Sequence, residues 1–155
     1  MILKQLMDVY EVIDRADASG SLVKELLESY GGKNITVKKI TGEKGSTDFV
    51  KIEIEGKNGK SKGGDAPTIG ILGRLGGIGA RPVMTGMVSD ADGAMVALSV
   101  AAKILDMQNK GDYLEGDVIV GTHICPDAPT QPHEPVPFMG SPVDMATVNK
   151  EEISD

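Results

Sequence analysis

The chain has 155 residues, 25% of them charged, and a net charge of −7, so it has the size of a single acidic domain. The negative charge argues against a nucleic-acid partner, because phosphate binding rests on Lys and Arg. No apolar run reaches the length of a membrane span, no signal peptide is visible, and the lone cysteine excludes an intrachain disulfide. We therefore expect a cytoplasmic single domain over residues 1–155 with no membrane partner.

The N-terminal residues predict two helices. Between Met1 and Asp14, apolar side chains recur at spacings of three and four and form one stripe, made of Leu3, Leu6, Met7, Tyr10 and Ile13. A second helix is expected to begin after Ser19 and to end before Gly31-Gly32, since glycine commonly follows a helix end.

The next residues change to a period of two, which predicts strands with one wet face at 35–39 and 50–54. Residues 68–72 are short and apolar and predict a buried central strand. Ser89 and Asp92 have the spacing of a capping box and are expected to open the longest helix, which is apolar on most faces and so largely buried.

A further strand at 118–121 leads to His123. Strand, helix and strand in this order form a βαβ unit with parallel pairing. The predicted fold class is therefore α/β, with a mixed, partly parallel sheet flanked by helices on both faces.

Both histidines and the only cysteine fall between His123 and Glu134. Histidine is the commonest metal ligand and the usual proton carrier near neutral pH. The segment thus predicts metal ligands at His123, Asp127 and His133, beside Cys125, and a catalytic base at Glu134. The alternative is structural: His123 ends a strand, Cys125 is a small buried hydrophobe, and the loop packs against a partner subunit.

Four prolines in the same segment, at 126, 129, 132 and 135, have the period of a polyproline II helix. They predict an ordered, extended segment from residue 125 to residue 137 that forms no strand ladder, because proline lacks an N–H group. The apolar residues 135–140 lie in this loop region and predict self-association, since exposed apolar patches usually mark contacts.

Two further groups carry candidate chemistry. Asp90 and Asp92 stand where the long helix is expected to begin, so they are either metal ligands or simple caps favoured by the helix dipole. The glycine run at 73–79 either wraps an anion through its N–H groups or serves close backbone packing. Its candidate substrate-binding residues are Gly76 and Gly77, with the guanidinium groups of Arg74 and Arg81 beside them.

The blocks at 63–67, 73–82, 88–93 and 122–144 closely resemble an uncharacterised prokaryotic family of unknown function. The resemblance covers essentially the whole chain. Members of that family are longer, which implies that this chain corresponds to the N-terminal half of a parent protein. The missing C-terminal half would then be a natural partner.

A more distant similarity is to the co-catalytic zinc aminopeptidases, through the order of strand, Asp, long Ala-rich helix, strand and acidic loop. It implies a phosphorylase/hydrolase-like fold and a divalent metal, with zinc as the candidate ion. Asp90 would match the Asp that bridges two metals, with Asp92 as its competitor, and Glu134 or the His123 position would fall near the catalytic Glu. Gly73-Arg74 stands where those enzymes have a ligand His, and their paired Glu-Glu is absent.

The sequence thus predicts a metal-assisted hydrolase for a small peptide or amide. Asp90, His123 and His133 would be ligands, Glu134 the base, and Arg74 or Arg81 the group that orients a substrate carboxylate. The alternative is a non-catalytic binding module that holds a small anionic metabolite between the glycine run and the proline loop, within a homo-oligomer.

Overall fold

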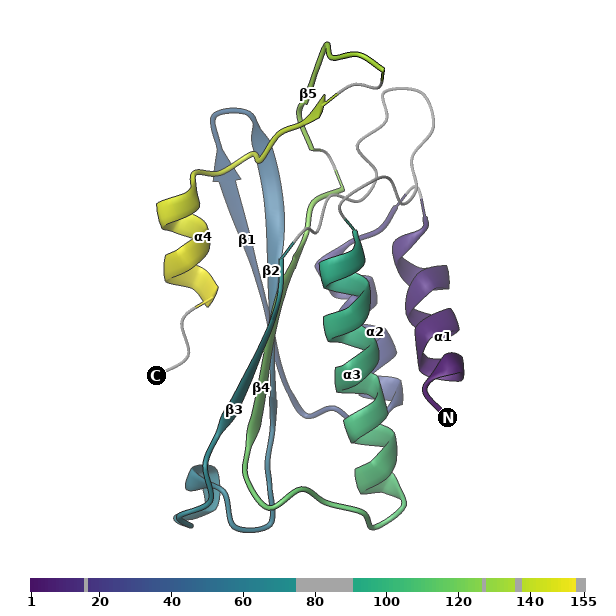
Figure 1. Ribbon diagram of the computed structural model, residues 1–155, viewed down its shortest axis with the longest axis vertical. Helices are drawn as coiled ribbons and strands as arrows, with labels where there is room; N and C mark the ends of the chain where they lie inside the picture. Colours follow the sequence, from purple (N-terminus) through teal and green to yellow (C-terminus); the bar gives the residue numbers. More distant parts are fainter. Residues whose placement is uncertain (16, 75–90, 127, 136–137, 153–155) are drawn as a thin grey trace.

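The computed structural model describes residues 1–15, 17–74, 91–126, 128–135 and 138–152, with only the backbone described at 130, 131, 138 and 139. A four-stranded mixed sheet separates three helices on one face from a short helix on the other (Figure 1). The strands are β1 (Asn34–Gly42), β2 (Gly45–Ile54), β3 (Ile69–Gly73) and β4 (Val118–Ile124), in the order β1-β2-β4-β3. The predicted α/β class is confirmed.

Helices α1 (Leu3–Ile13) and α2 (Gly20–Ser29) lie where the sequence predicted them. Ser19 caps α2, because its side chain accepts the backbone N–H of Leu22. The chain leaves this helix through Gly31, whose φ of 91° lies in the left-handed region that glycine adopts without strain.

The buried face of α1 differs from the predicted stripe. Gln5, Val9 and Ile13 are buried, whereas Leu3, Met7 and Tyr10 are 52%, 56% and 44% exposed. The contact of α1 with α3 (Asp92–Asn109) buries the side that carries Gln5, Val9 and Ile13. The stripe predicted the helix correctly, but of its members only Ile13 is buried and Leu6 is half-buried.

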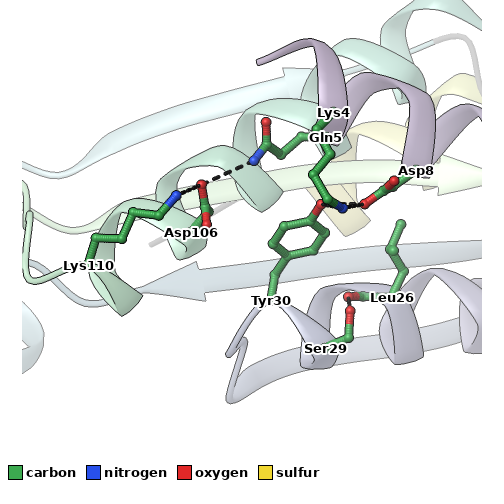
Figure 2. A network of polar contacts seen from close by, with 8 residues as sticks. All are labelled: Lys4, Gln5, Asp8, Leu26, Ser29, Tyr30, Asp106 and Lys110. Carbon is green, nitrogen blue, oxygen red and sulfur yellow. Dashed lines mark hydrogen bonds and ion pairs between the residues drawn. The ribbon is translucent and has the colours of Figure 1, made fainter. Parts of the chain in front are cut away.

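Polar contacts hold α1 against its neighbours (Figure 2). The Gln5 amide donates to the Asp106 carboxylate of α3 at 3.2 Å, and Lys110 pairs with the same carboxylate. On the other side, the Tyr30 hydroxyl and Lys4 both bond to Asp8. These contacts fix the rotation of α1 about its own axis. The spacing of its apolar residues does not determine this rotation.

The sheet combines an antiparallel hairpin with a parallel pair. β1 and β2 pair antiparallel from Asn34↔Glu53 to Gly42↔Gly45, and β2 also pairs antiparallel with β4. β3 pairs parallel with β4, and α3 (Asp92–Asn109) connects them, so the predicted βαβ unit is confirmed. Among the described residues, however, β3 is an edge strand, with Ile69 56% and Leu72 54% exposed, so the prediction of a buried central strand was wrong.

Helix α3 forms the centre of the hydrophobic core. The buried members of its inner face are Ala94, Ala97, Leu98, Ala101, Ala102, Ile104 and Leu105. Its N-cap is Ala91, without a side-chain capping bond, so the helix begins at Asp92. The predicted helix start at Ser89 therefore differs from the observed one. Ser89 itself lies outside the described residues.

The segment after β4 forms a short ladder of β5 (Thr130–Gln131) with β6 (Phe138–Met139). The prediction that this segment forms no strand pairing was wrong, because two residues between the prolines keep free N–H groups. The 3-10 helix η1 (Lys60–Lys62) lies in the glycine- and lysine-rich loop, and α4 (Met145–Glu152) packs against β2 through Val148 and Phe49. Among the described residues, no helix combines the length and apolarity that a membrane crossing requires.

Candidate functional site

His123 lies near the carboxyl end of β4, opposite Phe49 of β2. Their rings stack with centroids 5.5 Å apart and planes inclined by 29°. In open α/β sheets, ligands bind outside the carboxyl ends of the strands. The histidine that the sequence singled out is therefore at the end of the sheet where a site is expected.

The His123 imidazole contacts a buried hydroxyl. Oγ1 of Thr47, on β2, lies 3.1 Å from Nδ1 of His123, and it also donates to the Ile124 carbonyl at 3.1 Å. Thr47 is completely buried. The His123 imidazole thus contacts two side chains of β2, the ring of Phe49 and the hydroxyl of Thr47.

Burial lowers the pKa of His123 below its ordinary value of 6.5, and the positive charge of Arg74 lowers this pKa further. The imidazole is therefore neutral at neutral pH. A neutral imidazole has one nitrogen with a lone pair, which can accept a proton or bind a metal ion.

Arg74 follows β3 and belongs to the same end of the sheet. Its Nη2 forms an ion pair with Glu152 at 2.8 Å and donates to the Asn149 amide oxygen at 2.6 Å. The Glu152 side chain is 3% exposed, so this pair joins the end of β3 to α4. The guanidinium predicted to bind substrate is held by the protein's own carboxylate.

Backbone packing brings the start of α3 to this end of the sheet as well. A Cβ at Gly93 would lie 1.4 Å from the Arg74 carbonyl oxygen, and one at Gly73 would lie 2.2 Å from the Gly93 carbonyl oxygen. Thr122 Oγ1 donates to the Gly73 carbonyl at 2.6 Å and ties β4 to β3. At Gly73, the structural interpretation of the glycine run, close backbone packing, is confirmed.

A cavity of about 420 Å³ lies between the sheet and α4. Its apolar wall comes from β2, β3 and β4, and its polar rim includes Arg74 and Asn149. The lining includes Phe49, Leu72, Ile119, Gly121, Thr122 and Glu151. Phe49, whose ring stacks on His123, belongs to this lining, and His123 itself does not.

The other predicted site residues that the structure describes do not form a cluster. Asp92 is exposed at the start of α3, and His133 and Glu134 are exposed between β5 and β6. Within the described part of the chain, no three side chains of His, Cys, Asp or Glu are grouped so that they could hold a metal ion. Asp90, Asp127, Arg81, Gly76 and Gly77 lie outside the described residues.

Cys125 is buried, and its thiol contacts the Ser46 carbonyl at 3.6 Å. This position agrees with the interpretation of Cys125 as a small buried hydrophobe. Sequence reasoning missed Thr47 and Phe49, which are the nearest partners of His123. Neither carries a motif, and only the pairing of β2 with β4 could have revealed them.

Comparisons with known proteins agree with this architecture. A family model described as "Protein of unknown function (DUF1177)" matches residues 38–155. A search of curated proteins gave no significant match. Among solved structures, the chain is similar to the bottromycin maturation enzyme BotP in complex with Mn, with 13% identity and a TM-score of 0.52. The match covers 80% of this chain and 30% of that one, and at this identity it establishes the fold alone.

Proposed function

We propose that this chain, which belongs to the DUF1177 family, forms part of a divalent-metal-dependent hydrolase that acts on a peptide or amide bond. The observation that carries the proposal is the neutral imidazole of His123 at the carboxyl end of β4, stacked on Phe49, which lines the apolar cavity. Imidazole is the commonest nitrogen ligand for first-row metals, and a neutral one is also a proton acceptor.

The fold supports the metal as part of this proposal, because a structure that shares it holds Mn. The metal ligands of the proposed site do not all come from the described residues. The described residues supply one well-placed imidazole and not the three donors that a metal centre needs, so they do not fit a metal ion by themselves. Asp90 and Asp127 are the candidates from the sequence to complete the ligand set, and Asp92 lies at the same end of the sheet as His123.

The cavity between the sheet and α4 suggests how a substrate binds. Its wall of Phe49, Leu72 and Ile119 suits an aliphatic or aromatic side chain, and Asn149 could bond to a peptide group at the rim. The binding-module alternative needs a cation that an anionic metabolite can reach. It receives less support, because Arg74 is already paired with Glu152.

The two histidines allow a direct test. We expect sub-stoichiometric Mn²⁺ to broaden the imidazole NMR signals of His123 through its unpaired electrons and to leave those of exposed His133 sharp. Broadening of both would also support a metal ion bound near His123, with His133 within range of its unpaired electrons. If neither set of signals responds up to saturating Mn²⁺, the metal part of the proposal is wrong.

Activity is tested separately, with a mixture of short peptides and amino-acid amides incubated with Mn²⁺ and followed by mass spectrometry. We expect hydrolysis by the wild-type chain and its loss in H123A, with H133A as the matched histidine control. A titration with inorganic phosphate examines the alternative. Phosphate binding without any response to Mn²⁺ would favour a binding module.

A further inference from the structure

The Thr47 hydroxyl has one hydrogen and two close polar neighbours, the Ile124 carbonyl oxygen and Nδ1 of His123, each at 3.1 Å. A carbonyl oxygen can only accept a hydrogen bond. The hydroxyl hydrogen therefore belongs on the line to Ile124, since any other placement leaves two oxygens facing each other through lone pairs in a fully buried position.

With its hydrogen committed to Ile124, Thr47 can only accept from His123. Nδ1 must then carry the hydrogen, because an unprotonated Nδ1 would also meet Oγ1 lone pair to lone pair. At pH 8, above the ordinary imidazole pKa of about 6.5, a histidine carries one ring hydrogen. The remaining nitrogen, Nε2, therefore holds the lone pair.

We infer that Thr47 is a positioning residue that fixes His123 as the Nδ1–H tautomer and leaves Nε2 as its reactive atom. Phe49 assists by holding the ring plane, since it stacks on the imidazole at 5.5 Å. A histidine that binds a metal or accepts a proton through one nitrogen commonly donates its other N–H to a fixed partner, which sets tautomer and orientation. In this chain that partner is a hydroxyl on the neighbouring strand.

The inference deepens the proposed function, because it names the atom of His123 that would act there. It does not need that function to be correct for its own test. The tautomer can be read in the protein without metal or substrate, so failure of the tautomer assignment and failure of the hydrolase proposal are distinguishable.

The experiment is a long-range ¹⁵N–¹H correlation spectrum of the ¹⁵N-labelled chain at pH 8, where only two histidines give signals. We expect His123 to show a protonated-type shift at Nδ1 and an unprotonated-type shift at Nε2. Exposed His133 serves as the internal reference. The opposite pattern at His123 in the wild-type protein would overturn the inference, with no variant needed.

Two variants separate positioning from a merely structural role. T47S keeps the hydroxyl, so His123 should retain the wild-type pattern. T47V has nearly the same shape without the hydroxyl, so the two shifts should move toward the Nε2–H tautomer. An unchanged pattern in folded T47V would also overturn the inference. Where T47V does not fold, the wild-type and T47S spectra decide.

Discussion

Both carboxylate oxygens of Asp117 accept hydrogen bonds from Ser61: Oδ2 from its backbone N–H and Oδ1 from its hydroxyl, each at 2.8 Å. Oδ1 also accepts the backbone N–H of Gly56 at 2.9 Å. This single side chain at the start of β4 therefore fixes the loop that contains η1, at the end of the sheet opposite to His123.

The first prediction is that D117N destabilises the protein by about 2–3 kcal/mol, because the amide nitrogen that replaces one oxygen cannot accept, so one of the two backbone N–H groups loses its partner. Urea unfolding followed by circular dichroism measures the change. D112N, which removes the same charge at an exposed position, serves as the control and should stay near wild type. Equal midpoints for D117N and D112N would contradict the role assigned to Asp117.

The same contacts predict how this difference depends on pH. The N–H groups of Ser61 and Gly56 lower the pKa of Asp117 below its ordinary value of 3.8, so folding favours the charged form. Its contribution is complete above that ordinary value and is lost as the pH falls through the lower, folded value. The stability gap between wild type and D117N should therefore be constant near neutral pH and should narrow below about pH 4.

His123 predicts a second pH dependence in a different range. Its pKa is lowered from 6.5 in the folded protein, so below pH 6.5 the unfolded chain binds a proton that the folded one does not. The contribution of neutral His123 to the free energy of unfolding is complete above pH 6.5. It is lost as the pH falls through the pKa of His123 in the folded protein. Wild type should lose more stability than H123Q between pH 7.5 and pH 5.5 in urea unfolding series. Parallel pH profiles for the two proteins would refute this.

Close backbone packing predicts a strong effect of G93A. Its new methyl group would lie 1.4 Å from a backbone oxygen of Arg74, which cannot rotate away. We expect destabilisation of about 3 kcal/mol or more, at or above the usual range for overpacking. G121A is the matched control, because among the described residues its methyl group meets the end of the Leu72 side chain, at 3.1 Å, and no backbone atom. Similar melting temperatures for the two variants would argue against this packing.

The orientation of α1 can be tested by a pair of truncations on the same helix. I13A removes a fully buried side chain and should cost about 2–5 kcal/mol. M7A removes a side chain that is 56% exposed and should stay within about 0.5 kcal/mol of wild type. The sequence-based stripe contains both residues and predicts similar losses, so chemical denaturation distinguishes the two orientations.

Local patterns in the sequence were sufficient for most of the secondary structure. Ser19 and Gly31 mark the two ends of α2, because a capping hydroxyl and a left-handed glycine act within one turn of the chain. The alternation around Ile52 predicted the buried face of β2, since successive side chains of a strand point to opposite faces. Strand, long helix and strand predicted the parallel pairing of β3 with β4, because parallel neighbours need a crossover connection, which is usually a helix. His123 was found because the chain has only two histidines.

Tertiary structure alone decided the features that depend on strand order and on contacts between distant residues. The apolar content of Ile69 and Leu72 does not distinguish a central strand from an edge, and the sheet order places β3 at the edge. Thr47 and His123 are 76 positions apart, as Arg74 and Asn149 are 75 apart, and no spacing rule joins them. Hydrophobic periodicity reports which side of a helix or strand is apolar. The partner on that side, and therefore the tautomer of a histidine or the availability of an arginine, follows from the register in which the elements pack.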